Sequence, residues 1–175
     1  MAGLHDWRWC PRCRAELARG DGKVTCPECG LVQYANSEPT ASAIVRDERG
    51  RVLLARRAAE PHFGKWDLPG GFLEEGEHPL DALRRELREE AGVEVEPLEL
   101  AAIERDVYGD DDGSPWTLNL YWEARLASGD PQPADDVSEL RWFAPEELPG
   151  DEEIAFPNVA RVLARFRGSP GAPER

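Results

Sequence analysis

Residues 71–93 hold the side chains in this chain that are best suited to chemistry. The stretch contains seven carboxylates and three arginines. On a helix, which turns by about 100° per residue, Glu86, Glu89 and Glu90 form one acidic stripe. Neighbouring carboxylates repel one another unless a cation neutralises them, and Mg²⁺ prefers oxygen ligands and is commonly shared with substrate phosphates. The stripe therefore predicts a metal platform for phosphate chemistry; the alternative is a surface helix stabilised by ion pairs such as Arg85–Glu89.

The helix that positions this stripe is expected over residues 78–91. A proline stands in its first turn, where the missing N–H costs nothing, and Gly92 follows as the C-cap. Its apolar face consists of residues at helical spacing, namely Leu80, Leu83, Leu87 and Ala91. Because the acidic stripe borders this face, we expect the acids to lie where the helix meets the rest of the fold.

The same stretch resembles the Nudix hydrolase signature, with every specified spacing met. The matching residues are Gly71, Glu77, Arg85, Glu86, Leu87, Glu89, Glu90, Gly92 and Val93. The resemblance implies hydrolysis of the pyrophosphate bond in a nucleoside diphosphate linked to another moiety, with Mg²⁺ or Mn²⁺ as cofactor. It also implies that Glu86, Glu89 and Glu90 ligate the metal, joined by the backbone carbonyl of Gly71.

The resemblance assigns two further roles. Arg85 is expected to pair with Glu77 or with a helix carboxylate, which would hold the preceding loop onto the helix. The catalytic base is expected at Glu89 or Glu90, or in a later loop that contains Asp135, Asp136 and Glu139. Among these later residues Glu139 is the candidate that we include in the site. The alternative is that the two aspartates form a solvated turn and that Glu139 is an exposed strand residue.

Candidate substrate contacts come from outside the signature. Arg56 and Arg57 precede the WDLPGG segment and are expected to reach phosphates, with a surface role as the alternative. Phe156 is the aromatic candidate for stacking on a base, with burial in the core as its alternative.

Four cysteines form a second constellation. Cys10, Cys13, Cys26 and Cys29 make two CxxC pairs that are separated by twelve residues. Two such pairs can close around one tetrahedral Zn²⁺, and four thiolates leave no open position, so a structural zinc is predicted. The alternatives are a redox CxxC motif, which normally occurs once in an α/β fold, and two disulfides in a secreted domain, although the N-terminal residues show no apolar signal-peptide core.

The net charge and the length of the chain limit the classes of function that it can have. The chain has 175 residues, and its 35 acidic against 21 basic side chains give a formal net charge of −14. This charge argues against broad binding to nucleic acids or anionic membranes, and there is no apolar run long enough to span a membrane. We expect a cytoplasmic protein with a nucleotide-type small-molecule substrate and no nucleic-acid or membrane partner; a homodimer is left open.

The expected fold is α+β. The resemblance implies the Nudix α/β/α sandwich with a mixed sheet, preceded by a small zinc ribbon. The expected organisation is a zinc ribbon at 1–34, a linker at 35–39, the Nudix domain at 40–167 and a disordered tail at 168–175. Strands are expected near 40–46, 51–56, 94–107, 116–126 and 138–143, and a C-terminal helix at 157–167.

The substrate is narrowed by two further resemblances. NADH pyrophosphatases carry a Ser-Gln-Pro-Trp array after the signature, whereas the nearest match here, residues 113–116, reads Gly-Ser-Pro-Trp and lacks the glutamine. The WDLPGGF, SELRWFAPEELP and IAFPN segments look more like the ADP-ribose pyrophosphatase-like group. We therefore expect ADP-ribose or a related nucleotide sugar, with NADH pyrophosphatase, a non-catalytic ligand-sensing regulator and a zinc-ribbon nucleic-acid module as alternatives.

Overall fold

The computed structural model describes residues 4–109 and 113–167. The chain divides into two compact units, which are Met1–Glu38 with Val107–Thr117 (the cysteine unit) and Pro39–Asp106 with Leu118–Arg175 (the sheet unit). The expected disordered tail at 168–175 lies outside the described residues.

The cysteine unit is built on three short antiparallel strands in the order β1-β2-β3. Their bounds are Ala18–Gly20 (β1), Lys23–Thr25 (β2) and Val32–Tyr34 (β3), preceded by the 3-10 turn η1 at Leu4–Asp6. Strands β1 and β2 form a hairpin between the two CxxC pairs, and β3 is too short for its pattern to predict it. The hydrophobic core of the unit is small: among its described residues the buried cluster consists of Cys10, Leu17, Val24 and Cys26.

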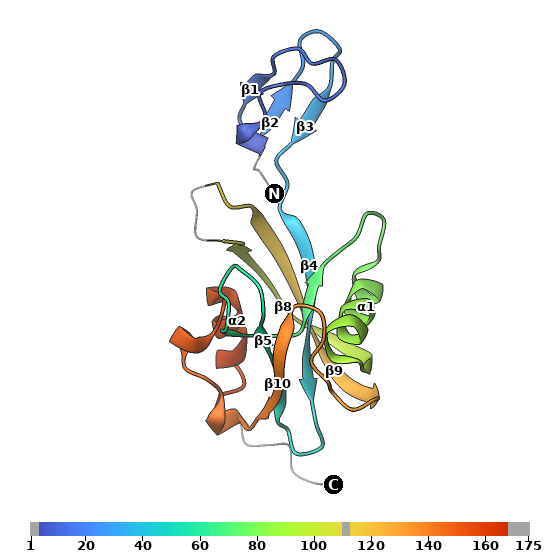
Figure 1. Cartoon of the computed structure of the whole chain (residues 1–175), viewed down its shortest axis with the longest axis vertical. Coiled ribbons are helices and arrows are strands. Elements are labelled where there is room, and N and C mark those ends of the chain that lie inside the picture. The colour runs from blue at the N-terminus through green and yellow to red at the C-terminus, as the bar shows by residue number, and fades with distance from the viewer. Residues whose placement is uncertain (1–3, 110–112, 168–175) are drawn as a thin grey trace. The chain divides into compact units, whose positions relative to one another are not determined.

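The sheet unit is built on a seven-stranded mixed sheet. Five strands lie in the order β10-β5-β4-β9-β8, while the short β6 and β7 pair with β5 and β4. Strand β4 is antiparallel to β5 but runs in the same direction as β9 (Figure 1). The bounds are Glu38–Arg46 (β4), Val52–Arg57 (β5), Trp66–Asp67 (β6), Gly70–Phe72 (β7), Glu94–Val107 (β8), Trp116–Ser128 (β9) and Val137–Phe143 (β10).

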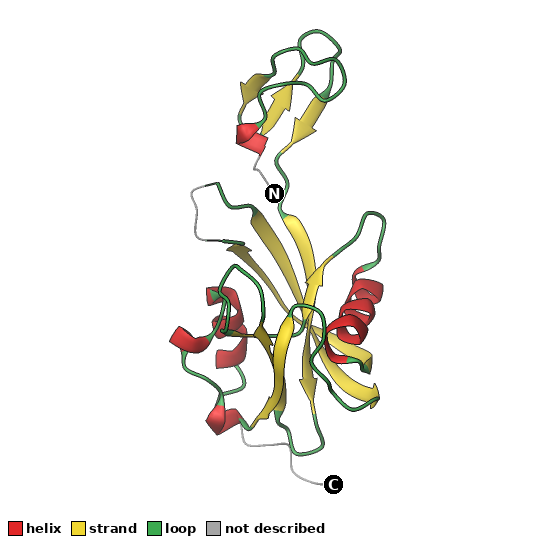
Figure 2. Cartoon of the chain, viewed as in Figure 1, coloured by secondary structure: helices red, strands yellow, loops and turns green. Residues whose placement is uncertain are grey.

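Helices cover both faces of this sheet (Figure 2). The acidic helix α1 spans Pro79–Ala91 on one face, and α2 spans Pro157–Ala164 on the other. Two 3-10 turns, η2 at Pro145–Glu147 and η3 at Asp151–Glu153, precede α2. The α/β/α sandwich with a mixed sheet that the resemblance implied is therefore confirmed.

The core between α1 and the sheet fixes the orientation of the helix. Leu83 and Leu87 are fully buried against Val45 and Leu53 of the two central strands. Full burial of one such side chain contributes about 1.5–3 kcal/mol, and truncation of a buried leucine to alanine costs about 2–5 kcal/mol. A rotation of α1 would expose these residues, so the acidic stripe beside them is held at the edge of the helix.

Three boundaries differ from the sequence-based expectation. Strand β4 begins at Glu38, inside the expected linker. Pro39 can be part of the strand although it lacks an N–H, because only its carbonyl is used there, accepting the Leu73 N–H at 3.1 Å. Helix α1 begins at Pro79 with His78 as its N-cap. Helix α2 ends at Ala164 rather than at residue 167, because the chain tightens into i→i−3 hydrogen bonds from the amides of residues 165 and 166.

Candidate functional site

Local sequence explains why α1 begins and ends where it does. The N-cap His78 accepts the Leu80 N–H through Nδ1 at 3.2 Å. At the other end Gly92 adopts a left-handed conformation with φ of 66°, and its N–H donates to the Arg88 carbonyl. Both caps satisfy backbone groups that a helix otherwise leaves unpaired, so the positions of the acids between them are well defined.

The three glutamates of the stripe differ in exposure. The Glu90 side chain is buried, and its Oε2 accepts the Gly70 N–H at 2.9 Å. The Glu86 side chain is 13% exposed and that of Glu89 is 50% exposed. The exposure of the acids therefore increases from Glu90, beside β7, through Glu86 to Glu89 at the surface.

Two glycines allow the chain to approach these carboxylates. A Cβ on Gly71 would lie 2.6 Å from the carboxyl carbon of Glu86, so this acid packs directly against the backbone of β7. Gly70 has φ of 140°, and a Cβ there would lie 2.3 Å from the Ala41 carbonyl oxygen. A side chain at Gly70 would clash with the backbone of β4, whereas one at Gly71 would displace the Glu86 carboxylate.

Arg85 is the hub of the site. Its Nε and Nη2 donate to the two carboxylate oxygens of Glu77, each at 3.0 Å, and Nη2 also donates to the Phe72 carbonyl. Its Nη1 donates to Glu86 at 2.8 Å and to Glu89 at 3.0 Å. The guanidinium thus joins the 72–77 loop to two acids of the helix. These hydrogen bonds, with the Glu74 N–H, lower the pKa of Glu77.

The remaining acids are not fully neutralised. Burial raises the pKa of Glu90 well above its usual value, against the Gly70 N–H, and the charges of Asp136 and Glu86 raise it further. Burial also raises the pKa of Glu86, against the Arg85 guanidinium, with Glu89 and Asp136 adding to the effect. Burial raises the pKa of Asp67 to about 6, although Arg57 opposes it. We define the acidic cluster by its five members, Asp67, Glu86, Glu89, Glu90 and Asp136.

Sequence reasoning missed Asp67 and passed over Asp136. Asp67 lies on β6, four residues before Gly71, and its position in the WDLPGG segment is the signal that could have found it. The turn before β10 brings Asp136 to the site: the N–H groups of residues 132 and 134 donate to the carbonyls of Ala91 and Glu90 at the end of α1. This anchoring is tertiary and leaves no pattern in the sequence.

The later candidates for base and substrate contacts lie elsewhere. Glu139 pairs with Arg56 at 3.4 Å, opposite it on the adjacent strand, and both side chains are more than two-fifths exposed. Arg57 instead pairs with Asp67 at 3.4 Å, and its guanidinium stacks over the ring of Phe156. Phe156 is buried, as its alternative interpretation had it. The structure therefore brings Arg57 to the acidic cluster and leaves Glu139 in a cross-strand ion pair with Arg56.

The donors of the acidic cluster suit a hard divalent cation. The Glu86 carboxylate packs against the backbone at Gly71, the Glu90 carboxylate accepts the Gly70 N–H, and Glu89 shares Arg85 Nη1 with Glu86. Oxygen donors with excess negative charge match Mg²⁺ or Mn²⁺ rather than a thiolate-preferring metal. Buried Glu90 and largely buried Glu86 lie close to one another and to Asp136, and burial together with these charges raises the pKa of both glutamates.

The cysteines form a compact cluster of a different kind. Their four Sγ atoms lie within 4.8 Å of one another, with Cys10–Cys29 at 3.6 Å and Cys13–Cys26 at 3.4 Å. A tetrahedron with Zn–S bonds of about 2.3 Å has S–S edges of about 3.8 Å, whereas a disulfide is far shorter. The arrangement is compatible with a zinc ribbon and excludes disulfides between these residues in this structure.

Each CxxC pair is shaped by one backbone hydrogen bond. The N–H of the residue that follows the pair, Arg14 or Gly30, donates to the carbonyl of the first cysteine, at 2.9 and 3.0 Å. Both residues take a left-handed conformation, with φ of 65° and 72°. The knuckles thus turn both thiols of a pair to the same side, which lets two pairs face one point.

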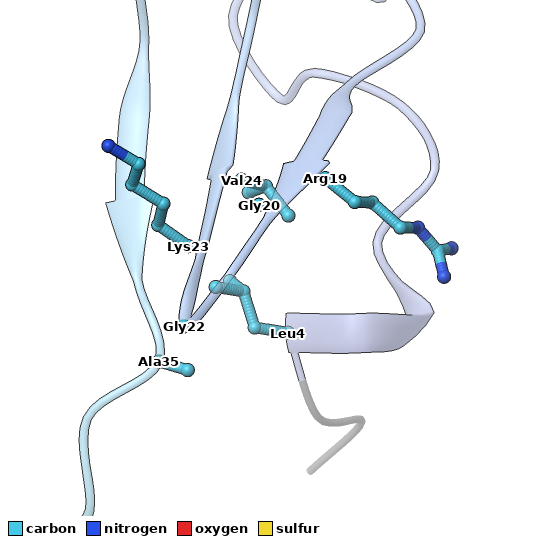
Figure 3. Close-up of a pocket in the computed structure, with 7 residues that line it drawn as sticks. All are labelled: Leu4, Arg19, Gly20, Gly22, Lys23, Val24 and Ala35. Atoms are coloured by element: carbon cyan, nitrogen blue, oxygen red, sulfur yellow. The ribbon is translucent and has the colours of Figure 1, made fainter.

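A separate cavity of about 160 Å³ lies in the cysteine unit (Figure 3). It is lined by Leu4, Arg19, Gly20, Gly22, Lys23, Val24 and Ala35. The two charged side chains point away from one another and no carboxylate lines the cavity. It therefore lacks the donors that phosphate chemistry with a divalent metal requires.

Among the described residues, no helix is long and apolar enough to cross a membrane.

Known proteins resemble this chain over most of its length. It is 36% identical to the NAD-capped RNA hydrolase NudC of Pseudomonas aeruginosa over 171 residues, which cover 93% of this chain but only 58% of that protein. It is 34% identical to a putative 8-oxo-dGTP diphosphatase 3 of Mycobacterium tuberculosis, covering 92% of this chain and 76% of that protein.

Solved structures give the same result for the fold. A Nudix hydrolase from Nitrosomonas europaea superposes with a TM-score of 0.76 at 31% identity, covering 94% of this chain and 95% of that chain. The NUDIX domain model matches residues 36–166, which include all strands of the sheet unit and both helices. The chain therefore belongs to the Nudix family.

Proposed function

We propose that this protein hydrolyses the pyrophosphate bond of a nucleoside diphosphate linked to another moiety, using Mg²⁺ or Mn²⁺. The observation that carries the proposal is the gradient of Glu90, Glu86 and Glu89 around Arg85, packed against the side-chain-free backbone at Gly71. Nudix membership adds to it, because the relatives include proteins named as an NAD-capped RNA hydrolase and a putative 8-oxo-dGTP diphosphatase.

In this proposal, Glu86, Glu89 and Glu90 hold the cation together with the carbonyl of Gly71. When bound, the cation would neutralise phosphate charge and lower the pKa of a bound water. The protein itself positions the reacting groups, which is the main requirement in phosphoryl transfer. Intact acids in a site that is partly open at Glu89 argue against a purely ligand-sensing regulator.

The other residues divide into positioning and proton transfer. Arg85 and Glu77 hold the 72–77 loop against α1 and do not contact the reacting atoms. For the later-loop base we place Asp136 ahead of Glu139, because Asp136 acts electrostatically on Glu86 and Glu90 while Glu139 is paired with Arg56. Asp67 holds Arg57, which is the better placed of the two arginines to meet a phosphate.

ADP-ribose or a related nucleotide sugar is the first candidate substrate. It is supported by the missing glutamine in residues 113–116 and by the WDLPGGF and IAFPN segments. An NAD-type dinucleotide is the second candidate, because several relatives between 30% and 36% identical act on NAD-capped RNA by name. Both candidates contain the same diphosphate linkage, so one site chemistry serves either.

One assay tests the reaction and ranks the substrates. Purified protein with Mg²⁺ is incubated with ADP-ribose, NADH, NAD-capped RNA, nucleotide sugars and 8-oxo-dGTP, and products are identified by chromatography. We expect release of a nucleoside monophosphate that EDTA stops. A kcat/KM for ADP-ribose at least about tenfold above that for NADH supports the first candidate, a difference of about 1.4 kcal/mol. The reverse order supports the second candidate, and the absence of hydrolysis of every compound contradicts the proposed function.

For the cysteine cluster we propose one structural Zn²⁺. Four thiols within 4.8 Å fill a tetrahedral shell, so no position is open for a substrate or water. Because the thiols lie together, their pKa values separate: against burial, the N–H groups of Cys13 and Arg12 lower the pKa of Cys10 to about 6, whereas the neighbouring thiols and burial raise the pKa of Cys13 and of Cys29.

A further inference from the structure

The loop between β5 and β6 forms a closed turn. The Gly64 N–H donates to the Arg57 carbonyl at 2.9 Å, and the Arg57 N–H donates to the Lys65 carbonyl at 3.0 Å. The Arg57 side chain closes the turn from inside, because its Nε donates to the Pro61 carbonyl at 2.8 Å. His62 and Gly64 take left-handed conformations on either side of Phe63. The backbone at Phe63 is therefore held on both sides.

This turn presents an aromatic ring to solvent. Phe63 is 65% exposed, the highest value among the exposed large apolar residues in the described part of the chain. Its ring makes no aromatic or cation–π contact with another described residue. Phe156 behaves in the opposite way: it is buried beneath the edge of the His62 ring, at 4.8 Å between centroids, and under the Arg57 guanidinium. Phe63, rather than Phe156, is thus the ring that is available for stacking.

The turn stands beside the acidic cluster. At its first residue the Ala58 N–H donates to the Asp136 carbonyl at 2.7 Å. At its base Arg57 pairs with Asp67, and both side chains are less than one-fifth exposed. Two members of the acidic cluster therefore anchor the turn, and Lys65, two residues after Phe63, adds a partly exposed cation on the same loop.

We propose that Phe63 stacks on the nucleobase of the substrate while the acidic cluster engages the diphosphate. An exposed aromatic ring gains by covering a planar base, and little backbone entropy is lost because hydrogen bonds already close the turn. The proposal rests on the proposed function for the identity of the substrate class. It makes Phe63 a specificity-determining residue and leaves the hydrolytic machinery to α1.

The test compares binding of a base-bearing ligand with that of a base-free one. AMP is titrated into wild-type protein, Phe63→Ala and Phe63→Trp in the presence of Mg²⁺, by calorimetry. We expect Phe63→Ala to weaken AMP binding about tenfold and Phe63→Trp to retain it, as stacking contributions of single bases imply. Pyrophosphate, which has no base, should bind the three proteins equally. Ile103→Ala is the matched control, since Ile103 is 58% exposed on β8, and it should leave AMP binding unchanged.

Kinetics separate this inference from the proposed function. On the best substrate, Phe63→Ala should raise KM about tenfold with kcat nearly unchanged. Equal AMP affinity in wild-type protein and Phe63→Ala, or no AMP binding by the wild-type protein, overturns the inference. A change of oligomeric state in solution on Phe63→Ala also overturns it, because the ring would then be a contact between copies of the chain. A wild-type protein that binds AMP through Phe63 but hydrolyses no diphosphate contradicts the proposed function alone.

Discussion

The cysteine cluster and the acidic cluster gather ligand-type side chains in opposite ways. The four thiols come from two similar knuckles and face one point, with all sulfur atoms within 4.8 Å. The carboxylates come from α1, β6 and the turn before β10, and they range from buried Glu90 to half-exposed Glu89. A closed, uniform set suits a metal that stabilises a small fold, whereas a graded, open set suits a metal that must also meet a substrate.

The same contrast appears in how each unit is stabilised. The cysteine unit buries only a few apolar residues, so it depends on its cluster for stability. The sheet unit buries Leu83, Leu87 and Ala91 of the expected apolar face of α1, while Leu80 stays partly exposed, so its acids can be placed for chemistry at some cost in repulsion. The lesson is that the proposed zinc would replace the core in one unit, whereas the proposed divalent cation would be held by a site that the core supports in the other.

The largest expected effect is the loss of the thiol cluster. We expect elemental analysis to find one Zn²⁺ per wild-type chain and none after Cys26 is replaced by Ser. The replacement should also unfold residues 8–34, because zinc binding in such modules carries about 10–16 kcal/mol of folding free energy. Hydrolysis by the sheet unit should remain within about threefold if folding of the ribbon is its only role. Wild-type protein that contains no zinc and carries oxidised CxxC pairs would overturn the zinc assignment.

Removal of one open-site charge should affect chemistry alone. We expect Glu89→Gln to lower kcat by at least about 10²-fold, because a charge that stabilises the reacting phosphate is lost. The melting temperature should stay close to that of the wild type, since the Glu89 side chain is half-exposed. Unchanged activity would remove Glu89 from the mechanism, and Glu139→Gln, measured in parallel, should cost much less.

Loss of the hub should affect both stability and chemistry. Arg85→Ala leaves partly buried Glu77 and Glu86 without their common cation, which should lower the free energy of unfolding by about 3 kcal/mol. The matched control is Arg88→Ala, one turn along α1, where the pair with Glu94 is half-exposed on both sides and should contribute less than about 0.5 kcal/mol. Chemical denaturation measures both values; equal losses would mean that Arg85 is an ordinary surface residue.

The smallest effect comes from a single methyl group. Gly71→Ala places a Cβ within 2.6 Å of the Glu86 carboxyl group, so this acid must move by a few tenths of an ångström or more. We expect kcat to fall about tenfold, since small misplacements in a catalytic site are costly. Gly20→Ala in the cysteine unit is the control, because its nearest new contact is an ordinary 3.7 Å to Lys23. No change in kcat for Gly71→Ala would show that Glu86 does not need this position.

Much of the framework follows from local patterns. Helical spacing of Leu83 and Leu87, the proline at its start and Gly92 at its end predict α1 almost to the residue. The expected strands match β4, β5, β8, β9 and β10 within a few residues, because each carries enough apolar residues to show its period. The short β3, β6 and β7 have two or three residues each and depend on partners that a pattern cannot reveal.

The site is predictable only as far as it is contiguous in sequence. The pairing of Arg85 with Glu77 was expected from the signature and is present. Asp67 and Asp136 reach the acidic cluster through strand register and through hydrogen bonds to the end of α1, which are tertiary. Phe63 has no pattern at all; its exposure depends on a turn closed by Arg57.

The segment after β9 fixes the position of the turn that carries Asp136 relative to the end of α1. Gly129 lies so close to the end of α1 that a Cβ would sit 2.9 Å from the Gly92 carbonyl oxygen, and two amides further on cap the last carbonyls of the helix. A residue inserted or deleted here would shift Asp136 relative to Glu90. The β5–β6 turn is closed mainly by hydrogen bonds within itself, from the Gly64 N–H to the Arg57 carbonyl and from Arg57 Nε to the Pro61 carbonyl. Under the proposed role of Phe63, substitutions in this turn would change which nucleotides are bound while the spacing of the acidic cluster stays the same. Nucleotide selection and hydrolysis would thus reside in separate parts of the fold.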